Sequence, residues 1–140
     1  HPPPHFPYLR NEASCVLLVA SAHGSALLPG DIGEVVERRL LREPERLRAD
    51  VVVVAHHGSN GSSSPGFVAA TGARLALIGA GHGNRFGHPR PQVVERWREQ
   101  GTEVLATPAS GAIRVWLDED GLSVRERRPW RARLWDRRDP

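Results

Sequence analysis

The sequence predicts a single α/β domain in which helices pack on a mostly buried mixed sheet. Two short runs, residues 51–55 (VVVVA) and 74–79 (RLALIG), are too apolar for exposed strands and have the length of buried ones. Segments with helical periodicity alternate with these runs, which is typical of layered α/β folds. With 140 residues, 39% of them hydrophobic, the chain is long enough to bury a core. We expect the domain to occupy residues 1–124.

The first part of the chain is expected to form a hairpin of strands after an extended lead-in. Residues 1–10 are rich in proline, which excludes helix and most sheet pairing. Residues 15–20 (CVLLVA) are predicted to be a second buried strand, paired with a short strand at residues 26–28. Cys15 is the one cysteine, so it forms no internal disulfide and would act as a small apolar side chain in that strand.

An amphipathic helix is predicted over residues 31–41. Its apolar face is expected to carry Ile32, Val35, Val36 and Leu40, and its polar face Glu34, Glu37 and Arg38. Asp31 and Glu34 have the spacing of a capping box at the start of a helix. The polar residues 42–49 are expected to connect this helix to the valine-rich strand.

Proline and glycine mark the boundaries of the remaining elements. One helix is predicted over residues 65–71, ended by Gly72, and another from Pro91 to a stop at Gly101. A short strand follows at residues 103–106. The last element is expected to be a hairpin of residues 112–117 and 122–127 around an Asp-Gly-containing turn.

Three polar loops follow three of the predicted strands, at residues 29–31, 56–59 and 84–89. If these strands are parallel neighbours, the loops meet at one edge of the sheet, where open α/β sheets bind ligands. Asp31, His56 and His57 would then offer oxygen and nitrogen ligands that suit zinc or manganese. Such a metal lowers the pKa of bound water to about 7 and so supplies hydroxide.

Each of these residues also has a structural explanation. Asp31 is equally explained as the N-cap of the following helix. Ser59 is equally explained as part of a polar loop, and Asn84 and His88 as residues that fix a glycine-rich turn. Thr107 is expected to serve turn geometry alone.

Several blocks of sequence, in this order, resemble one family. The blocks are NEASCVL (11–17), LLPGDI (27–32), ADVVVVAHHGS (49–59), NRFGHP (84–89), GTEV (101–104) and TPASG (107–111). Together they resemble the ComEC family, the competence channels that carry DNA across the inner membrane. The resemblance runs over residues 1–117 and is to the C-terminal half of the metallo-β-lactamase-like domain of that family.

The resemblance implies a partial αββα sandwich, two divalent metals, and a phosphodiesterase or nuclease that degrades the DNA strand that is not imported. It implies that Asp31 and His57 bind metal, with His56 open as the alternative histidine ligand or as a residue near the scissile phosphate. Ser59, Asn84 and His88 match family positions near the site. It also implies an inner-membrane protein whose domain lies on the extracytoplasmic side, with single-stranded DNA and the transmembrane channel as partners.

The sequence departs from the family pattern in two places. The first metal motif of the family, a cluster of histidines and aspartates, is absent from these residues. Pro108 also stands where the family often has an acidic residue. We therefore expect this chain alone to bind metal poorly and not to hydrolyse DNA. Half of a sandwich also leaves one sheet face uncovered, which predicts a homodimer or loose packing there.

Residues 125–140 are predicted to form a flexible basic tail. This segment has seven arginines against three acidic residues, a net charge of +4, whereas the remaining residues have 12 arginines against 13 acids. Its arginines alternate with Trp130 and Trp135, a composition that suits single-stranded DNA or an anionic membrane surface. The same composition is explained as a disordered terminus encoded by a GC-rich genome.

Three functions remain open from the sequence. The first is a metal-dependent phosphodiester hydrolase completed by residues outside this chain. The second is a catalytically silent module that binds DNA or a partner through the basic tail. The third is a different hydrolase of the same superfamily.

Overall fold

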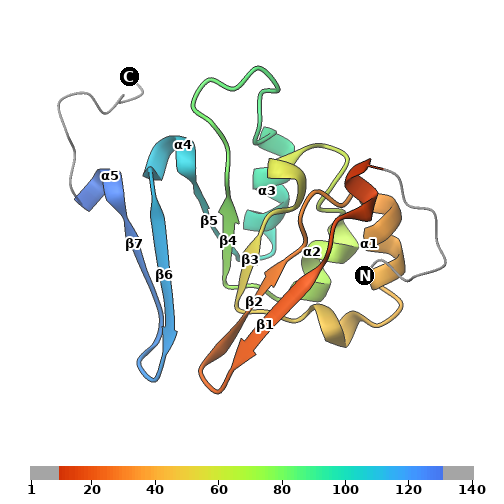
Figure 1. The fold of residues 1–140 in the computed structure, drawn as a ribbon, viewed down its shortest axis with the longest axis horizontal. Coiled ribbons are helices and arrows are strands. Elements are labelled where there is room, and N and C mark those ends of the chain that lie inside the picture. Colours follow the sequence, from red (N-terminus) through yellow and green to blue (C-terminus); the bar gives the residue numbers. More distant parts are fainter. Residues whose placement is uncertain (1–9, 131–140) are drawn as a thin grey trace.

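A computed structural model describes residues 10–130 and, within the last helix, not the side chains of residues 129 and 130 (Figure 1). Five strands form one sheet in the order β1-β2-β3-β4-β5, and two more form a separate hairpin, β6-β7. β1 (Leu17–Ser21) is antiparallel to β2 (Gly24–Leu28). β2, β3 (Val51–Val53), β4 (Leu75–Ile78) and β5 (Glu103–Ala106) are parallel. The predicted α/β class and the central position of the valine strand are confirmed.

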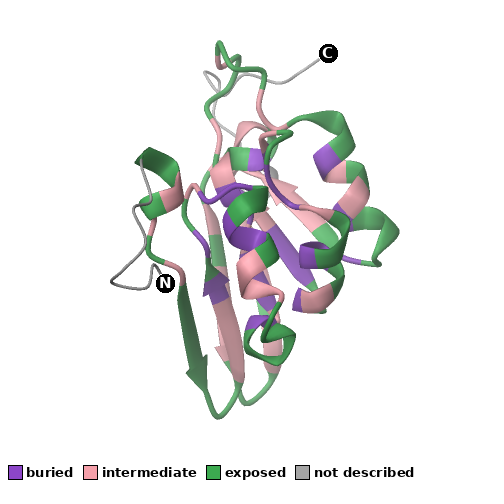
Figure 2. Cartoon of the chain, turned by 90° about the vertical axis from the view of Figure 1, so that its right-hand side faces the viewer, coloured by how far each residue is buried: buried purple, intermediate pink, exposed green. Residues whose placement is uncertain are grey.

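The three main helices lie together on one side of the sheet (Figures 1 and 2). They are α1 (Glu34–Leu40), α2 (Pro65–Thr71) and α3 (Pro91–Glu99). α2 and α3 each begin with proline, whose fixed φ suits the first turn. Gly72 and Gly101, at φ +57° and +77°, follow their ends in the left-handed conformation that glycine adopts most easily. Both helices therefore have the predicted bounds. No helix among residues 10–130 is long and apolar enough to cross a membrane.

Short helical turns complete the fold. They are η1 (Arg10–Ala13), η2 (Pro44–Leu47), η3 (Ala55–Gly58), α4 (Thr107–Ser110) and α5 (Arg127–Trp130). The predicted proline-rich lead-in and most of the predicted tail, residues 1–9 and 131–140, lie outside the described residues. The first two residues of that tail, Arg125 and Glu126, belong to β7 (Gly121–Glu126).

The core lies between the sheet and the helices. Alternate strand residues Leu27, Val52 and Ala76 face the helices and are buried against Phe67 and Trp97. The hairpin of β6 (Ile113–Asp118) and β7 lies on the opposite side of the sheet, with Leu117 close to Gly24 (Figure 1). Thus the middle of the sheet is covered on both faces.

The prediction for the first helix was wrong in three respects. The helix begins at Glu34, with Gly33 as its N-cap, so Asp31 does not cap it. Val35, assigned to the apolar face, is 48% exposed, whereas Glu37, assigned to the polar face, is completely buried. The physical reason is long-range. The carboxylate of Glu37 accepts hydrogen bonds from the backbone N–H groups of residues 63 and 64, so it satisfies a buried loop.

The prediction that the strand at residues 15–20 is buried is also wrong. The strand exists as β1 and pairs with β2, as expected, but all five of its residues are exposed, and so is Cys15. Leu17 and Val19 are 55% and 51% exposed on one face, and Leu18 is 41% exposed on the other. β1 is the edge of the sheet, and within residues 10–130 no further strand pairs with it.

Candidate functional site

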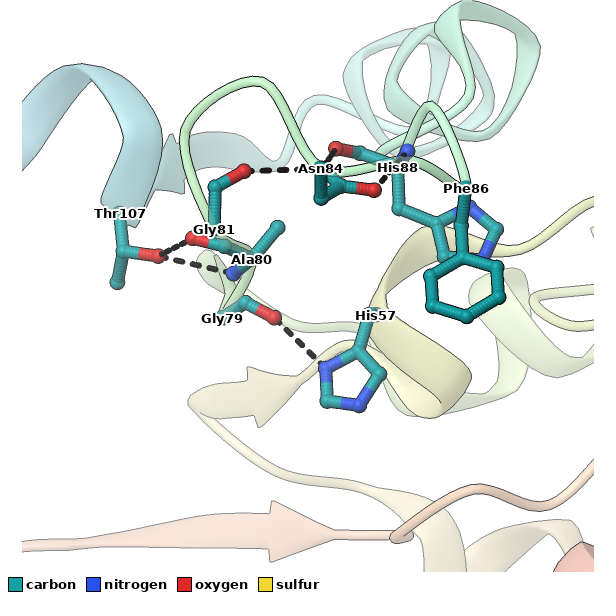
Figure 3. A pocket seen from close by; sticks show the side chains of 8 residues that line it. All are labelled: His57, Gly79, Ala80, Gly81, Asn84, Phe86, His88 and Thr107. Carbon is teal, nitrogen blue, oxygen red and sulfur yellow. Dashed lines mark hydrogen bonds between the residues drawn. The ribbon is translucent and has the colours of Figure 1, made fainter.

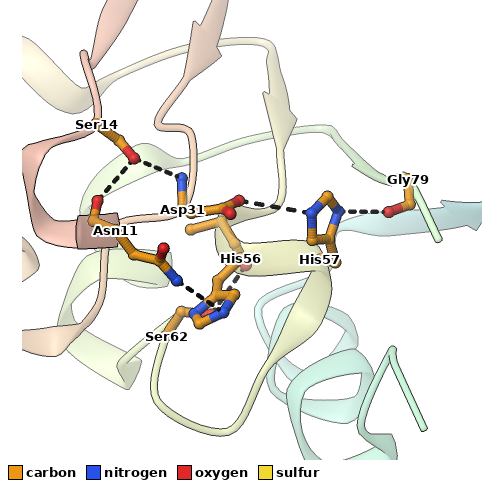
Figure 4. Close-up of polar contacts among 8 residues, drawn as sticks. Asn11, Ser14, Asp31, His56, His57, Ser62 and Gly79 are labelled. Carbon is orange, nitrogen blue, oxygen red and sulfur yellow. Dashed lines mark hydrogen bonds and ion pairs between the residues drawn. The ribbon is translucent and has the colours of Figure 1, made fainter. Parts of the chain in front are cut away.

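Three loops meet at the carboxyl end of the parallel strands, as predicted. They follow β2, β3 and β4, which are neighbours in the sheet and run in the same direction. The first loop carries Asp31 and the second His56 and His57. Asp31 Oδ1 lies 3.6 Å from His57 Nε2, so the structure brings together the two side chains predicted to bind metal (Figure 4).

The two histidines lie in a left-handed turn, which points their side chains in different directions. His56 and His57 have φ of +50° and +56°, and Gly58 follows at +79°. Left-handed backbone costs a residue other than glycine about 1 kcal/mol or more. The turn is held by the hydroxyl of Ser62, which donates to the carbonyl oxygens of Ala55 and Ser59 at 2.9 and 3.0 Å. A strained conformation is thus kept by bonds from the following loop.

His57 is oriented by the loop after β4. Its Nδ1 lies 2.7 Å from the carbonyl oxygen of Gly79 (Figure 4). Because a carbonyl oxygen can only accept, Nδ1 is the donor of this bond and carries the proton. In the neutral form of the ring Nε2 therefore carries the lone pair, and this atom faces Asp31; in the protonated form the same contact is an ion pair. Histidine ligands of metals are commonly held by this type of bond to a carbonyl group.

Asp31 is positioned by the segment before β1. Ser14 Oγ accepts a hydrogen bond from the backbone N–H of Asp31 at 3.2 Å and donates to the carbonyl oxygen of Asn11 at 2.7 Å. Glu12 accepts from the backbone N–H of Gly33 at 3.3 Å. The sequence reasoning assigned no role to Asn11, Glu12 or Ser14. Their place in the first of the resembling blocks was the available signal.

His56 points away from the Asp31–His57 pair. The side-chain amide nitrogen of Asn11 lies 3.2 Å from its Nε2, and since an amide nitrogen donates, Nε2 is the acceptor (Figure 4). Its ring lies edge-on to that of His88, with 6.1 Å between the ring centroids. The two adjacent histidines therefore contact different neighbours, and it is His57 that faces Asp31.

The loop after β4 is closed by Asn84. Its amide donates to the carbonyl oxygens of Gly81 and His88 at 2.9 and 2.6 Å, and its Oδ1 accepts from the N–H of His88 at 3.0 Å. Phe86, at the tip, is 57% exposed and stacks on His88 with 5.9 Å between the centroids. The guanidinium of Arg85 lies 4.8 Å from the centre of the Phe86 ring. Asn84 thus has the turn-fixing contacts given as its structural explanation.

No protein-family model matches the chain. It is 34% identical to Competence protein ComA of Neisseria gonorrhoeae, over 86% of this chain and 18% of that protein. It is 33% identical to ComE operon protein 3 of Bacillus subtilis, over 76% of this chain and 14% of that protein. It is 34% identical to Recombination protein 2 of Haemophilus influenzae, over 89% of this chain and 16% of that protein.

The chain is a relative of competence proteins. It spans less than a fifth of the length of each of these three relatives, so it corresponds to one segment of them. The resemblance stated from the sequence agrees with these names at the level of competence.

In this relative of competence proteins, an open pocket of about 500 Å³ lies between the loops after β3 and β4 and the residue that follows β5 (Figure 3). His57 and His88 lie on its wall together with Phe86 and Thr107. His88 Nδ1 is buried and has no hydrogen-bond partner among residues 10–130. Burial lowers the pKa of His88, and the positive charge of Arg90 lowers this pKa further. His88 is therefore a neutral imidazole at neutral pH, with an unpaired nitrogen.

Thr107 has a larger part in the site than the predicted turn geometry. Its hydroxyl accepts from the N–H of Ala80 at 2.9 Å and donates to the carbonyl oxygen of the same residue at 2.7 Å (Figure 3). These two bonds fasten the end of β5 to the loop that follows β4. That loop includes Gly79, whose carbonyl orients His57. A bond between distant segments of this kind has no local signal in the sequence.

Ser59 remains within its own turn. Its hydroxyl accepts from the N–H of Gly61 at 3.4 Å, and its own N–H donates to the carbonyl oxygen of His56 at 3.0 Å. The structure thus pairs Asp31 with His57 and His56 with His88, and leaves Ser59 and Asn84 in the turns that hold them. Among residues 10–130, no group of three or more His, Cys, Asp or Glu side chains is arranged to share a metal.

Proposed function

We propose that this chain is part of a metal-dependent phosphodiesterase that cleaves DNA during competence. The proposal rests on one observation: two atoms that can bind a metal, Asp31 Oδ1 and His57 Nε2, face each other at 3.6 Å. This separation is too long for a hydrogen bond between them. In the neutral ring, the proton on His57 Nδ1 leaves the lone pair of Nε2 directed at the carboxylate. A cation between these atoms would satisfy both.

The separation of the two atoms fits a shared zinc or manganese ion. Metal–nitrogen and metal–oxygen bonds of about 2.1 Å at a tetrahedral angle place the two ligand atoms about 3.4 Å apart. The pair also has the support that ligands need, because Gly79 holds His57 and Ser14 holds the backbone of Asp31. Two ligands do not complete a coordination sphere. The remaining ligands are therefore assigned to residues outside 10–130.

When bound, the metal would supply an activated water for attack on a phosphodiester. The residues of this chain have separate tasks. Asp31 and His57 hold the cation, and the carbonyl of Gly79 keeps the proton of His57 on Nδ1. His88, neutral and beside His56, offers an unpaired ring nitrogen, Nδ1, at the wall of the pocket. Phe86 is the exposed aromatic ring on which a base of the substrate could stack.

The biological setting is part of the proposal. We infer that the enzyme degrades the DNA strand that is not imported. It acts at the inner membrane, on its extracytoplasmic side, next to a transmembrane channel of the same polypeptide. Support comes from the names of the relatives and from their length, of which this chain matches 14–18%. The isolated chain is expected to bind metal weakly and to be inactive.

The test uses both this chain and the longest polypeptide that its gene encodes. Asp31→Asn and His57→Gln are expected to lower the affinity of the 140-residue chain for Mn²⁺ at least tenfold, measured by electron paramagnetic resonance. In the longer polypeptide they should reduce cleavage of labelled single-stranded DNA at least 100-fold. Ser59→Ala is the matched control, since its hydroxyl stays within the turn. Full cleavage by Asp31→Asn would refute the role of the pair.

A second candidate is a catalytically silent module that binds DNA through arginines near the C-terminus. The favouring observation is the seven arginines of residues 125–140 against three acids. Under this function, cleavage by the longer polypeptide is unaffected by Asp31→Asn, and salt-sensitive DNA binding is lost when these arginines are replaced. A different hydrolase of the same superfamily would require Asp31 and His57 for metal binding but would not cleave DNA.

A further inference from the structure

The outer face of the β6–β7 hairpin gathers arginines around a tryptophan. Alternate residues of a strand share a face, and the register of the hairpin pairs Arg114 with Arg125 and Trp116 with Ser123. These residues point away from the five-stranded sheet, because the next residue along, Leu117, lies against Gly24 of β2. Arg114 and Arg125 are exposed, and the hairpin is the outermost layer on this side of the molecule (Figure 1).

The register of the hairpin concentrates positive charge at one point of this face. Like charges directly opposite each other on paired strands destabilise a hairpin. Arg114 and Arg125 are such a pair, and their guanidinium carbons also lie 5.6 and 5.5 Å from the centre of the Trp116 ring. Asp118 shares this face but lies at the turn, about 13 Å along the strand from Arg114.

A hollow of about 520 Å³ lies beside this arginine pair. Its walls are formed by Ala112, Ile113, Arg114, Arg125 and Arg127, so three of five lining residues are arginines. Guanidinium groups bind phosphate through paired N–H donors, and a half-exposed indole offers a flat surface for a base. The β-ribbon holds both in fixed positions relative to each other.

We propose that this face, Arg114, Trp116, Arg125 and Arg127, binds single-stranded nucleic acid. The phosphates of the strand lie against the arginines, and an unpaired base stacks on the indole ring of Trp116. A membrane surface fits less well, because Ala112, Asp118 and Ser123, which share this face, provide no bulky aliphatic side chains to insert. A duplex fits less well, because its bases are already stacked. The surface uses neither Asp31 nor His57 and is independent of cleavage.

The test measures binding of the 140-residue chain to a fluorescein-labelled 20-nucleotide oligo-dT, by anisotropy, over a range of salt concentrations. Arg114→Gln with Arg125→Gln should weaken binding at least tenfold and lower the slope of log K against log salt by about 1.4, since each phosphate contact contributes about 0.7. Trp116→Leu should weaken binding about tenfold with an unchanged slope.

Matched controls distinguish binding by this surface from a general effect of positive charge and from binding by the predicted tail. Arg42→Gln with Arg48→Gln removes the same charge from exposed positions on either side of η2 and should leave both affinity and slope nearly unchanged. Arg131→Gln with Arg133→Gln tests the tail. The proposal is overturned if either control pair weakens binding as much as the hairpin pair does. It is also overturned if duplex of the same length binds as tightly, or if anionic vesicles bind the chain and oligo-dT does not. Unchanged melting temperatures show that each variant is folded.

Discussion

β1 and β3 are both mainly aliphatic strands but lie in opposite environments. Both are runs of aliphatic residues, LLVAS and VVV, in the same five-stranded sheet. Val52 in β3 is completely buried between layers, whereas Val19 in β1 is 51% exposed at the edge. An apolar pattern therefore indicates that a strand is suited to burial. Whether the strand is buried depends on other elements of the fold packing against it. Residues 10–130 provide that layer for β3 and do not provide it for β1.

The largest expected effect tests this difference directly. Val52→Asp places a charge in the core and should cost more than about 4 kcal/mol of the free energy of unfolding, or prevent folding. Val52→Ala, at about 2–3 kcal/mol, keeps the effect measurable by urea denaturation. Val19→Asp should change the free energy of unfolding by about 0.5 kcal/mol or less. An equal loss from Val19→Asp and Val52→Asp would mean that β1 is covered, and the comparison would fail.

A smaller effect is expected from the buried carboxylate on the covered side. Glu37 accepts hydrogen bonds from the N–H groups of Ser63 and Ser64 at 2.5 and 2.8 Å, and Arg96 donates to the carbonyl of Ser63 in the same loop. Glu37→Gln places an amide group against one of these donors and should cost about 2 kcal/mol in urea denaturation. The control is Glu34→Gln, whose exposed carboxylate is 4.0 Å from Arg38 and should matter by less than about 0.5 kcal/mol.

The same carboxylate gives stability a pH dependence of definite sign. Burial raises the pKa of Glu37 above 4.5, although hydrogen bonds from Ser64 and Ser63 oppose the shift. The folded state therefore binds more protons than the unfolded state, and the contribution of Glu37 falls as pH rises from 4.5 through the raised pKa. The stability difference between wild type and Glu37→Gln should shrink over this range in chemical denaturation. A difference that grows with pH would contradict the assigned direction.

The smallest effect on stability should accompany a clear effect on association. We expect the chain to self-associate through β1, because an unpaired apolar edge strand is a template for pairing. Leu17→Lys with Val19→Lys should make the chain monomeric, measured by light scattering after size-exclusion chromatography, and change stability by less than about 0.5 kcal/mol. Val35→Lys is the control, since Val35 is as exposed but lies on α1. Equal dissociation by Val35→Lys would assign the contact to another surface.

Local signals predicted most of the fold. α2, α3 and β5 have the predicted bounds because proline and glycine fix their ends within a few residues. The central position of β3 followed from an uninterrupted apolar run, and the meeting of three loops followed from the direction of parallel strands. The approach of Asp31 to the two histidines was predicted from these two facts, whereas the choice of His57 over His56 came from the family resemblance.

The misses share one cause, which is contact between distant parts of the chain. The burial of Glu37 depends on residues 63 and 64, and the fastening of Ala80 by Thr107 joins positions 27 residues apart. α1 begins at Glu34 and not at residue 31, because the N–H of Glu34 donates to the carbonyl oxygen of Gly61, a residue of another loop. One difference is local and not long-range: in the final hairpin, Glu119 and Asp120 form the turn and Gly121 opens β7, because Asp118 pairs with Gly121.

The turn at His56 and His57 has a consequence for engineering. Glycine would adopt the backbone angles of either position without strain, so a stability-only redesign would favour glycine at both. The same exchange would delete the imidazole that faces Asp31 and the one that faces His88. At these two positions, a gain in stability would therefore come with the loss of the imidazole side chains. A redesign of this protein should hold both fixed and seek its gains elsewhere.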